Sequence, residues 1–250
     1  MGLKVFVAGG SGAVGHSLLP LLREAGHDIT ATTRTSAKRE VLRSLGCSTI
    51  VVDVFDQPAL DRAVQTASPD VVIHQLTDLS AGLDPNDPSA REKVLRGNAR
   101  LRREGTGNLV RAARGAGVSR VIAQSIAWAY APKTPPYLET DPLDSTATGI
   151  RALSVVDGVI PLERSVLDQQ DFIGIVLRYG QLYGPGTWAS QPAGDSPLHL
   201  DAAAYAALLA IDRGPAGAYN IAEPGGAVVV DKAMRELGWR ADFRLAPPRS

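Results

Sequence analysis

The sequence predicts an α/β fold, a doubly wound parallel sheet of the Rossmann type with a small, reduced C-terminal substrate-binding region. Strand-like runs of β-branched and aromatic residues alternate along the chain with segments whose apolar residues recur at helical spacing. The runs VVIH at 71–74 and IGIVLR at 173–178 are almost wholly apolar, as expected of parallel strands covered on both faces. A glycine-rich turn also follows the first strand.

The individual elements follow from this pattern in chain order. The run LKVFVA at 3–8 ends in glycines and predicts the first strand, and the helical spacing of apolar residues over 13–25 predicts the first helix. The same alternation predicts strands at 28–33, 49–54, 71–76, 120–125 and 172–179, and helices at 36–45, 58–67, 91–116 and 155–169. Right-handed crossovers join such units into one parallel sheet.

Three long connections, 80–90, 131–150 and 184–197, are rich in Pro, Gly and Asp. Loops of this length inside a compact domain are usually functional. We therefore expect a dinucleotide-binding domain at 1–180 and a reduced substrate-binding region at 181–250, with elements of the second part returning to the core.

Composition excludes several classes of function. The 250 residues include 26 Lys plus Arg and 26 Asp plus Glu. The chain therefore has no surplus of positive charge with which to bind nucleic acid or an anionic membrane surface. The longest apolar run, 202–210, is far shorter than the ~20 residues that span a bilayer. A single cysteine, Cys47, cannot form an intramolecular disulfide, and no secretory leader is visible ahead of the first strand. These features predict a cytoplasmic location.

The glycine turn GGSGAVG has the spacing of a dinucleotide-binding loop. A side chain at Gly9 would block the tight turn, one at Gly12 would block approach to a pyrophosphate, and one at Gly15 would separate helix from strand. Ala13 and Val14 then open the helix, whose free N–H groups face the phosphates. The alternative is a glycine-rich turn that binds nothing.

The end of the second strand favours NADP over NAD. A carboxylate there would accept hydrogen bonds from the adenosine ribose of NAD, but the chain has Thr32, Thr33 and Arg34. Arg34 suits a 2′-phosphate, so NADP is the expected cofactor and NAD is possible; otherwise Arg34 is a solvated loop residue. Asp53 closes the third strand and accepts from the adenine amino group, or else caps a turn.

Further motifs extend over most of the chain, and the sequence resembles the extended or atypical short-chain dehydrogenase/reductase superfamily, the NAD-dependent epimerase/dehydratase group. The resemblance is carried by GGSGAVG, Asp53, His74-Gln75, Gly105-Thr106, Asn108-Leu109, Ser125 with Tyr130, Glu139, LRYGQLYGPG at 177–186, His199-Leu200-Asp201 and Tyr219-Asn220. It implies that Val54, Gln75 and Leu76 also contact the cofactor, and that the two long helices can form a homodimer.

The catalytic positions depart from the resemblance. Similar proteins pair a Tyr with a Lys four residues on, because the ammonium acidifies the phenol that exchanges a proton with the substrate. If Glu163 is the family's glutamate four residues beyond that Lys, the Tyr and Lys positions fall on Val155 and Val159. No lysine occurs between Lys133 and Lys232 that could replace it.

Two further positions also differ from the family's residues when the chain is counted without gaps. The hydroxyl that helps to polarise the carbonyl, four residues before Tyr130, falls on Ile126. The helix asparagine, three residues before Gly105, falls on Arg102. The usual proton relay is therefore expected to be absent.

Two functions remain open. The first is an NAD(P)-binding epimerase/dehydratase-like oxidoreductase that acts on a small carbonyl, hydroxyl or sugar-like substrate through a displaced proton donor, with Tyr130 and Ser125 the best remaining hydroxyls. The second is a non-catalytic dinucleotide-binding sensor or partner protein. The four histidines have no metal-ligand spacing, so no metal is expected.

Overall fold

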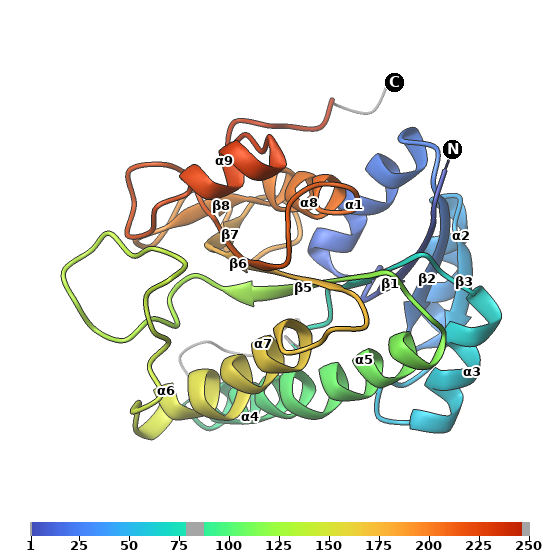
Figure 1. Cartoon of the computed structure of the whole chain (residues 1–250), viewed down its shortest axis with the longest axis horizontal. Helices are drawn as coiled ribbons and strands as arrows, with labels where there is room; N and C mark the ends of the chain where they lie inside the picture. Colours follow the sequence, from blue (N-terminus) through green and yellow to red (C-terminus); the bar gives the residue numbers. More distant parts are fainter. Residues whose placement is uncertain (1, 79–87, 247–250) are drawn as a thin grey trace.

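The computed structural model describes residues 2–78 and 88–246, which form a seven-stranded parallel sheet with helices on both faces (Figure 1). The strand order is β3-β2-β1-β4-β5-β6-β9, and all six pairings are parallel. A separate parallel pair joins β7 to β8. The predicted fold class, a doubly wound Rossmann-type sheet, is confirmed.

The strands are β1 (Lys4–Ala8), β2 (Asp28–Thr33), β3 (Ser48–Val51), β4 (Val71–His74), β5 (Arg120–Ile126), β6 (Ile173–Tyr179), β7 (Gln181–Tyr183), β8 (Pro197–His199) and β9 (Gly217–Ile221). The helices are α1 (Ala13–Glu24), α2 (Arg39–Ser44) after a 3₁₀ turn (Ser36–Lys38), α3 (Gln57–Ala67), α4 (Pro88–Arg100), α5 (Thr106–Gly115), α6 (Gly149–Ser154), α7 (Ile160–Leu167), α8 (Leu200–Leu209) and α9 (Asp231–Leu237). Two π-helical turns, Leu101–Gly105 and Val155–Val159, lie between α4 and α5 and between α6 and α7.

Two apolar cores cover the two faces of the sheet. Side chains of α1, α2, α8 and α9 pack on one face, and side chains of α3, α5 and α7 pack on the other. Figure 1 shows the corresponding layers, with α1, α8 and α9 above the sheet and α4, α5 and α7 below it. Every residue of β4 is buried, because both of its faces are covered. This explains its almost wholly apolar sequence.

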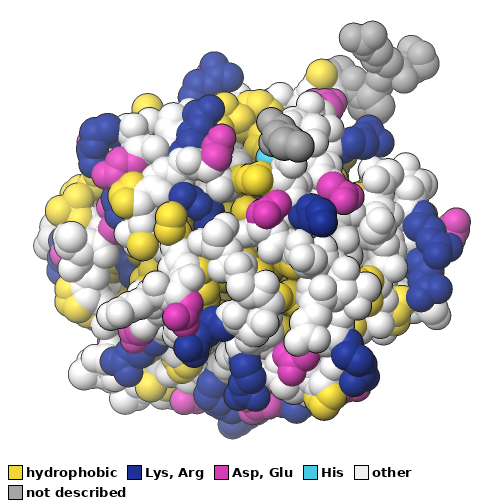
Figure 2. Space-filling model, turned by 45° about the vertical axis from the view of Figure 1, so that its right-hand side comes forward, with side chains coloured by type: hydrophobic (Ala, Val, Ile, Leu, Met, Phe, Trp, Pro, Cys, Tyr) yellow, Lys and Arg dark blue, Asp and Glu magenta, His cyan; other side chains and the backbone are white. Residues whose placement is uncertain are grey.

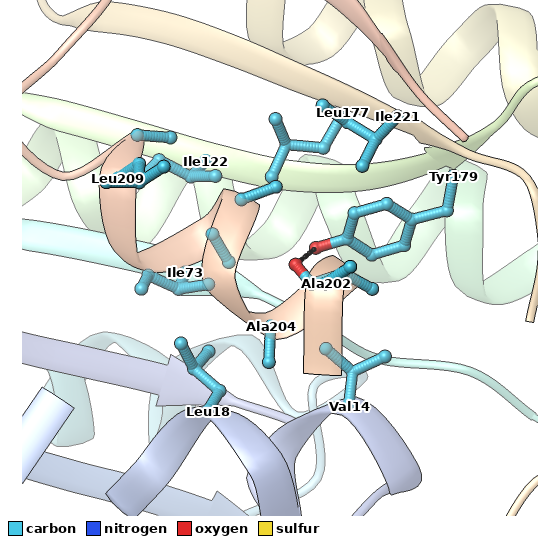
Figure 3. Close-up of a cluster of buried hydrophobic side chains, with 14 of the residues drawn as sticks. Val14, Leu18, Ile73, Ile122, Leu177, Tyr179, Ala202, Ala204, Leu209 and Ile221 are labelled. Atoms are coloured by element: carbon cyan, nitrogen blue, oxygen red, sulfur yellow. Dashed lines mark hydrogen bonds between the residues drawn. The ribbon is translucent and has the colours of Figure 1, made fainter. Parts of the chain in front are cut away.

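Helix α8 is the most closely packed element of the upper layer. Figure 3 shows its alanines facing Val14 and Leu18 of α1 on one side and strand residues on the other. Ala202 and Ala204 are completely buried, and their small side chains let α8 approach both neighbours. The Tyr179 hydroxyl donates to the carbonyl oxygen of Ala203 at 3.1 Å, which ties β6 to the helix.

The structure refines the predicted elements. The helix expected at 91–116 is α4 and α5 with a π-helical turn between them, and the one expected at 155–169 begins as the second π-helical turn. β9 was not predicted, although it completes the sheet by pairing with β6. Residues 80–87 of the first long connection lie outside the described part of the chain. The predicted boundary at 180 stays a prediction; β9 and α8 belong to the same sheet and core as the residues before it.

The surface agrees with the balanced charge of the sequence. Basic and acidic side chains both occur across the face shown in Figure 2, and neither sign dominates it. Within residues 2–78 and 88–246, no helix is both long enough and apolar enough to cross a membrane, and no cluster of metal-ligating side chains occurs.

Candidate functional site

A crevice opens at the carboxyl ends of β1, β2 and β4, where the strand order reverses direction. From β1 the chain proceeds outward through β2 to β3, and then returns to β4 on the other side. Ligands of open α/β sheets bind at this type of switch point. The crevice is lined by the glycine turn, by residues 32–35 after β2, by Val52 and Val54, and by residues 75–77 after β4.

The glycine turn forms a cradle that side chains would fill. Gly9 has a φ of +93°, and a Cβ there would lie 2.5 Å from the carbonyl oxygen of Gln75. A Cβ on Gly15 would overlap the backbone of Gly10, so this glycine lets α1 pack on the turn itself. At Gly12 a Cβ would meet only the Gly9 carbonyl oxygen, at 3.4 Å, and the space beyond is open. The turn therefore leaves room for a ligand at Gly12.

The N-terminus of α1 is free to bind an anion. Gly12 caps the helix without a side-chain hydrogen bond, and no acidic residue lies in the first turn. Helix N–H groups and the helix dipole favour phosphate at such a position. The side chain of Val14 is buried in the core, so this residue can contact a ligand only through its backbone N–H. The cradle fits the pyrophosphate of a dinucleotide.

The adenosine side of the crevice combines buried threonines with one exposed cation. Thr32 and Thr33 are buried, whereas Arg34 is half-exposed and pairs with Asp78 at 3.1 Å. Asp53 accepts from the backbone N–H of Phe55 at 2.9 Å, the turn-capping alternative considered for it. Val54 lines the crevice and accepts from the Asn108 side chain at 3.0 Å through its carbonyl oxygen.

Gln75 places an unpaired acceptor at the crevice. Its Nε2 donates to the Tyr179 hydroxyl at 3.2 Å, while its Oε1 is buried without a hydrogen-bond partner among the described residues. A buried acceptor without a donor is costly, and a hydroxyl or amide of a bound ligand would satisfy it. Leu76, which also lines the crevice, accepts from the Gln124 side chain at 3.1 Å through its carbonyl oxygen.

The positions counted as the family's proton relay form an apolar cluster. Ile126, at the end of β5, packs with Val155 and Val159 and with Ala129. Val155 and Val159 are 1% and 0% exposed. The structure thus brings together the three places assigned to the hydroxyl, the phenol and the ammonium, and each holds an aliphatic side chain. None of these side chains can exchange a proton.

The comparisons with known proteins identify the family. Residues 5–210 match the NAD dependent epimerase/dehydratase family. The chain belongs to this family. It is 38% identical over 241 residues to a 3-diazoavenalumate denitrifying reductase from a Streptomyces species, a match that covers 88% of this chain and 76% of that protein.

Solved structures of this family share the fold of the chain. UDP-glucose 4-epimerase from Thermotoga maritima superposes with a TM-score of 0.75 at 18% identity, covering 96% of this chain and 94% of that one. The Bordetella bronchiseptica enzyme WbmG, solved with NAD and UDP, gives 0.70 at 23% identity, covering 98% and 91%. The predicted class, an NAD(P)-binding oxidoreductase or epimerase-like protein, is confirmed, and a nicotinamide dinucleotide is its cofactor class.

Ser125 and Tyr130, the two predicted catalytic hydroxyls, lie in a buried hydrogen-bond network centred on an ion pair. Arg178 on β6 donates to Glu163 on α7 through Nε at 3.0 Å and Nη2 at 2.7 Å, and Ser125 Oγ donates to the same carboxylate at 2.8 Å. The Tyr130 hydroxyl accepts from Arg178 at 2.8 Å and donates to Asn220 at 2.5 Å. Both predicted hydroxyls therefore have protein partners.

Burial and neighbouring charges shift the pKa values of Tyr130, Arg178 and the nearby Arg102. Burial raises the pKa of the Tyr130 phenol, and the neighbouring Arg178 cation only partly opposes this shift. Burial acts to lower the pKa of Arg178, but Glu163 raises it above its usual range. Arg102 lies beside Gly158, and burial lowers its pKa to about 10, so it stays charged. The catalytic roles of Tyr130 and Ser125 stay predictions.

The pairing of Arg178 with Glu163 is not predicted from the sequence, although one signal for a buried partner is present. Arg178 interrupts an otherwise apolar buried strand, and a buried arginine requires an acidic partner. The identity of that partner could not be deduced, because Glu163 is on a different element. Asn220 was noted only as part of the resemblance.

We expect Gly12→Val to abolish dinucleotide binding and leave the fold intact. The Gly12 backbone has φ −84° and ψ 174°, which valine adopts readily, so the added methyl groups project into the open space of the cradle. Titration calorimetry with NAD and NADP measures the loss, and circular dichroism checks the fold. Gly107→Val is the matched control, because a Cβ at Gly107 meets nothing within 4 Å. Wild-type affinity in Gly12→Val would contradict this assignment.

We expect Tyr130→Phe to lower the free energy of unfolding by about 1–3 kcal/mol, because Arg178 and Asn220 each lose a buried partner. Urea unfolding measures this change, and Tyr219→Phe serves as a buried-hydroxyl control remote from the crevice. The turnover rate of the same sample distinguishes a catalytic role of the Tyr130 hydroxyl from a purely structural one. A loss of about 10²-fold at unchanged cofactor affinity supports a proton donor, whereas retained turnover supports a purely structural hydroxyl.

Proposed function

We propose that the protein is an NADPH-dependent reductase that reduces its substrate without the usual proton relay. The observation that carries this proposal is the apolar cluster of Ile126, Val155 and Val159 near the carboxyl end of β5, two strands from the cofactor cradle. Reduced nicotinamide, when bound, supplies a hydride. The chain's own residues in the cluster supply no acid, which suits a substrate that needs only the hydride.

Arenediazonium compounds are the substrate class that fits this site best. The Streptomyces relative is named for removal of nitrogen from a diazo compound, and the chain shares 38% of its residues over the matched region. Reduction of an arenediazonium to the arene breaks one C–N bond, forms one C–H bond and releases N₂. The overall reaction consumes a hydride and no proton, so a Tyr/Lys pair is unnecessary.

The cofactor contacts in this proposal follow the geometry of the crevice. The backbone of Gly9, Gly12, Ala13, Val14 and Gly15 holds the pyrophosphate. On the adenosine side Val54 and Arg34 line the crevice. We assign Val54 and the neighbouring Asp53 to the adenine, and Arg34 to the 2′-phosphate. Gln75 and Leu76 contact the ligand from the end of β4.

The proposed function comes with a domain organisation, a cellular location and an assembly. Residues 1–180 supply the dinucleotide-binding domain and residues 181–250 the reduced substrate-binding region. The one cysteine, Cys47, is buried and free, which suits a reducing cytoplasm. We propose that the protein forms a homodimer through its two long helical segments, residues 91–116 and 155–169.

A second candidate function rests on the same absence of a relay. A dinucleotide-binding sensor or partner protein also needs the cradle and no proton donor. Within the enzyme hypothesis, Tyr130 and Ser125 provide the alternative donor for a carbonyl substrate. Turnover with substrates of both kinds distinguishes these three possibilities.

We expect NADPH to reduce an arenediazonium in the presence of the protein faster than in its absence, and to leave ketones and aldehydes unchanged. With cofactor deuterated at C4, the label should appear on the arene carbon, and D₂O should contribute none there. Mass spectrometry of the arene measures both. Gly12→Val is the control for uncatalysed hydride transfer. Turnover of carbonyls would favour a Tyr130 donor, and no turnover of either class would favour the sensor.

We expect NADP to bind about tenfold or more tightly than NAD, because a charge-assisted hydrogen bond contributes about 1.5–3 kcal/mol. Arg34→Ala should remove most of this difference while leaving NAD affinity nearly unchanged. Titration calorimetry measures the affinities. Arg114→Ala is the matched control, since Arg114 is an equally exposed arginine paired with Asp171. Equal affinities of the wild-type protein for the two cofactors would contradict the preference.

A further inference from the structure

The crevice is crossed by an ion pair whose acidic member has no role in the proposed function. Arg34 follows β2 and Asp78 follows β4, and these strands lie on opposite sides of β1 and its glycine turn. Their side chains meet with Arg34 Nη2 3.1 Å from Asp78 Oδ1. The cation that we assign to the 2′-phosphate is therefore already paired with a carboxylate.

Asp78 is held more firmly than Arg34. Its backbone N–H donates to the Oδ1 of Asn98 at 2.9 Å, and Asn98 is buried and donates to the Val94 carbonyl oxygen at 3.2 Å. The Asp78 carboxylate also packs against α4 where Gly97 has no side chain, in the space that a Cβ would occupy. Arg34 instead lies on a surface segment and is 53% exposed. An exchange of partners therefore moves Arg34 and leaves Asp78 in place.

We propose that Asp78 is a specificity-determining residue that competes with the 2′-phosphate of NADP for Arg34. This inference rests on the proposed role of Arg34. Binding of NADP exchanges one anionic partner of Arg34 for another, whereas NAD, which lacks the 2′-phosphate, leaves the ion pair intact. The fixed carboxylate thus sets the preference for NADP below the value that Arg34 alone would give.

The size of the effect follows from the exposure of the pair. Ion pairs between side chains this exposed are weak, and loss of such a competitor changes an affinity by about two- to fivefold. Asp78→Asn should therefore tighten NADP binding about two- to fivefold and leave NAD binding unchanged. The difference should shrink as salt is raised, because the competition is electrostatic.

A double-mutant cycle tests the competition by titration calorimetry with NADP and NAD. The proteins are the wild type, Asp78→Asn, Arg34→Ala and the double variant. The matched control is Asp171→Asn, which breaks the exposed pair with Arg114 at the amino end of β6. We expect Asp78→Asn to tighten NADP binding in the presence of Arg34 and to have no effect in the Arg34→Ala background.

Three results would overturn the proposal: unchanged or weaker NADP binding in Asp78→Asn, the same tightening in the Arg34→Ala background, or weaker NAD binding in Asp78→Asn. The second would mean direct repulsion of the phosphate, and the third a carboxylate that holds the NAD ribose. The proposed function fails separately, since it requires Arg34→Ala to remove the preference for NADP whatever Asp78→Asn does.

Discussion

The buried ion pair between Glu163 and Arg178 holds together the elements around the end of β5. Both side chains are almost wholly buried, and breaking such a pair costs about 3–5 kcal/mol because the remaining charge is left uncompensated. Through Ser125, Tyr130 and Asn220 it joins β5, β6, β9, α7 and the connection after β5. The hydroxyls of Ser125 and Tyr130 thus help to hold these elements together.

The glycine-rich cradle is built on a different principle, because it depends on backbone rather than on side chains. The cradle requires that Gly9 approach the end of β4 and that α1 begin at an uncapped glycine, and neither condition involves a titratable group. Changes at the relay positions therefore leave this half intact. Val155 and Val159 belong to a separate buried cluster with Ile126 and Ala129, where their apolar side chains pack against one another.

Much of the fold could be predicted from local signals. The strand before Gly9 and the helix after Gly12 were read directly from residue type and spacing, and the positions Val155 and Val159 were found by counting along the chain. The partners of Arg178 and Arg34 could not be found in this way, because Glu163 and Asp78 come from other elements and only the sheet order brings them close. β9 is not predicted because Gly, Ala and Asn in GAYNI are residue types that strands disfavour, and pairing with β6 rather than its own sequence makes it a strand.

Helix α8 packs closely on α1 through its alanines. The position of the cradle therefore depends on the size of buried side chains as well as on the sequence of the glycine turn. Ser17 on α1 donates to Asp201 on α8 at 2.9 Å, so the two helices are joined by a hydrogen bond as well as by close packing. A larger side chain at Ala204, which faces Leu18 of α1 in Figure 3, has no space to occupy and must displace α1. Because α1 begins directly after the glycine turn, the packing between α8 and α1 fixes the position of the backbone amides at the start of α1 relative to the sheet. Buried residues outside the crevice therefore control the geometry of the cradle through their size.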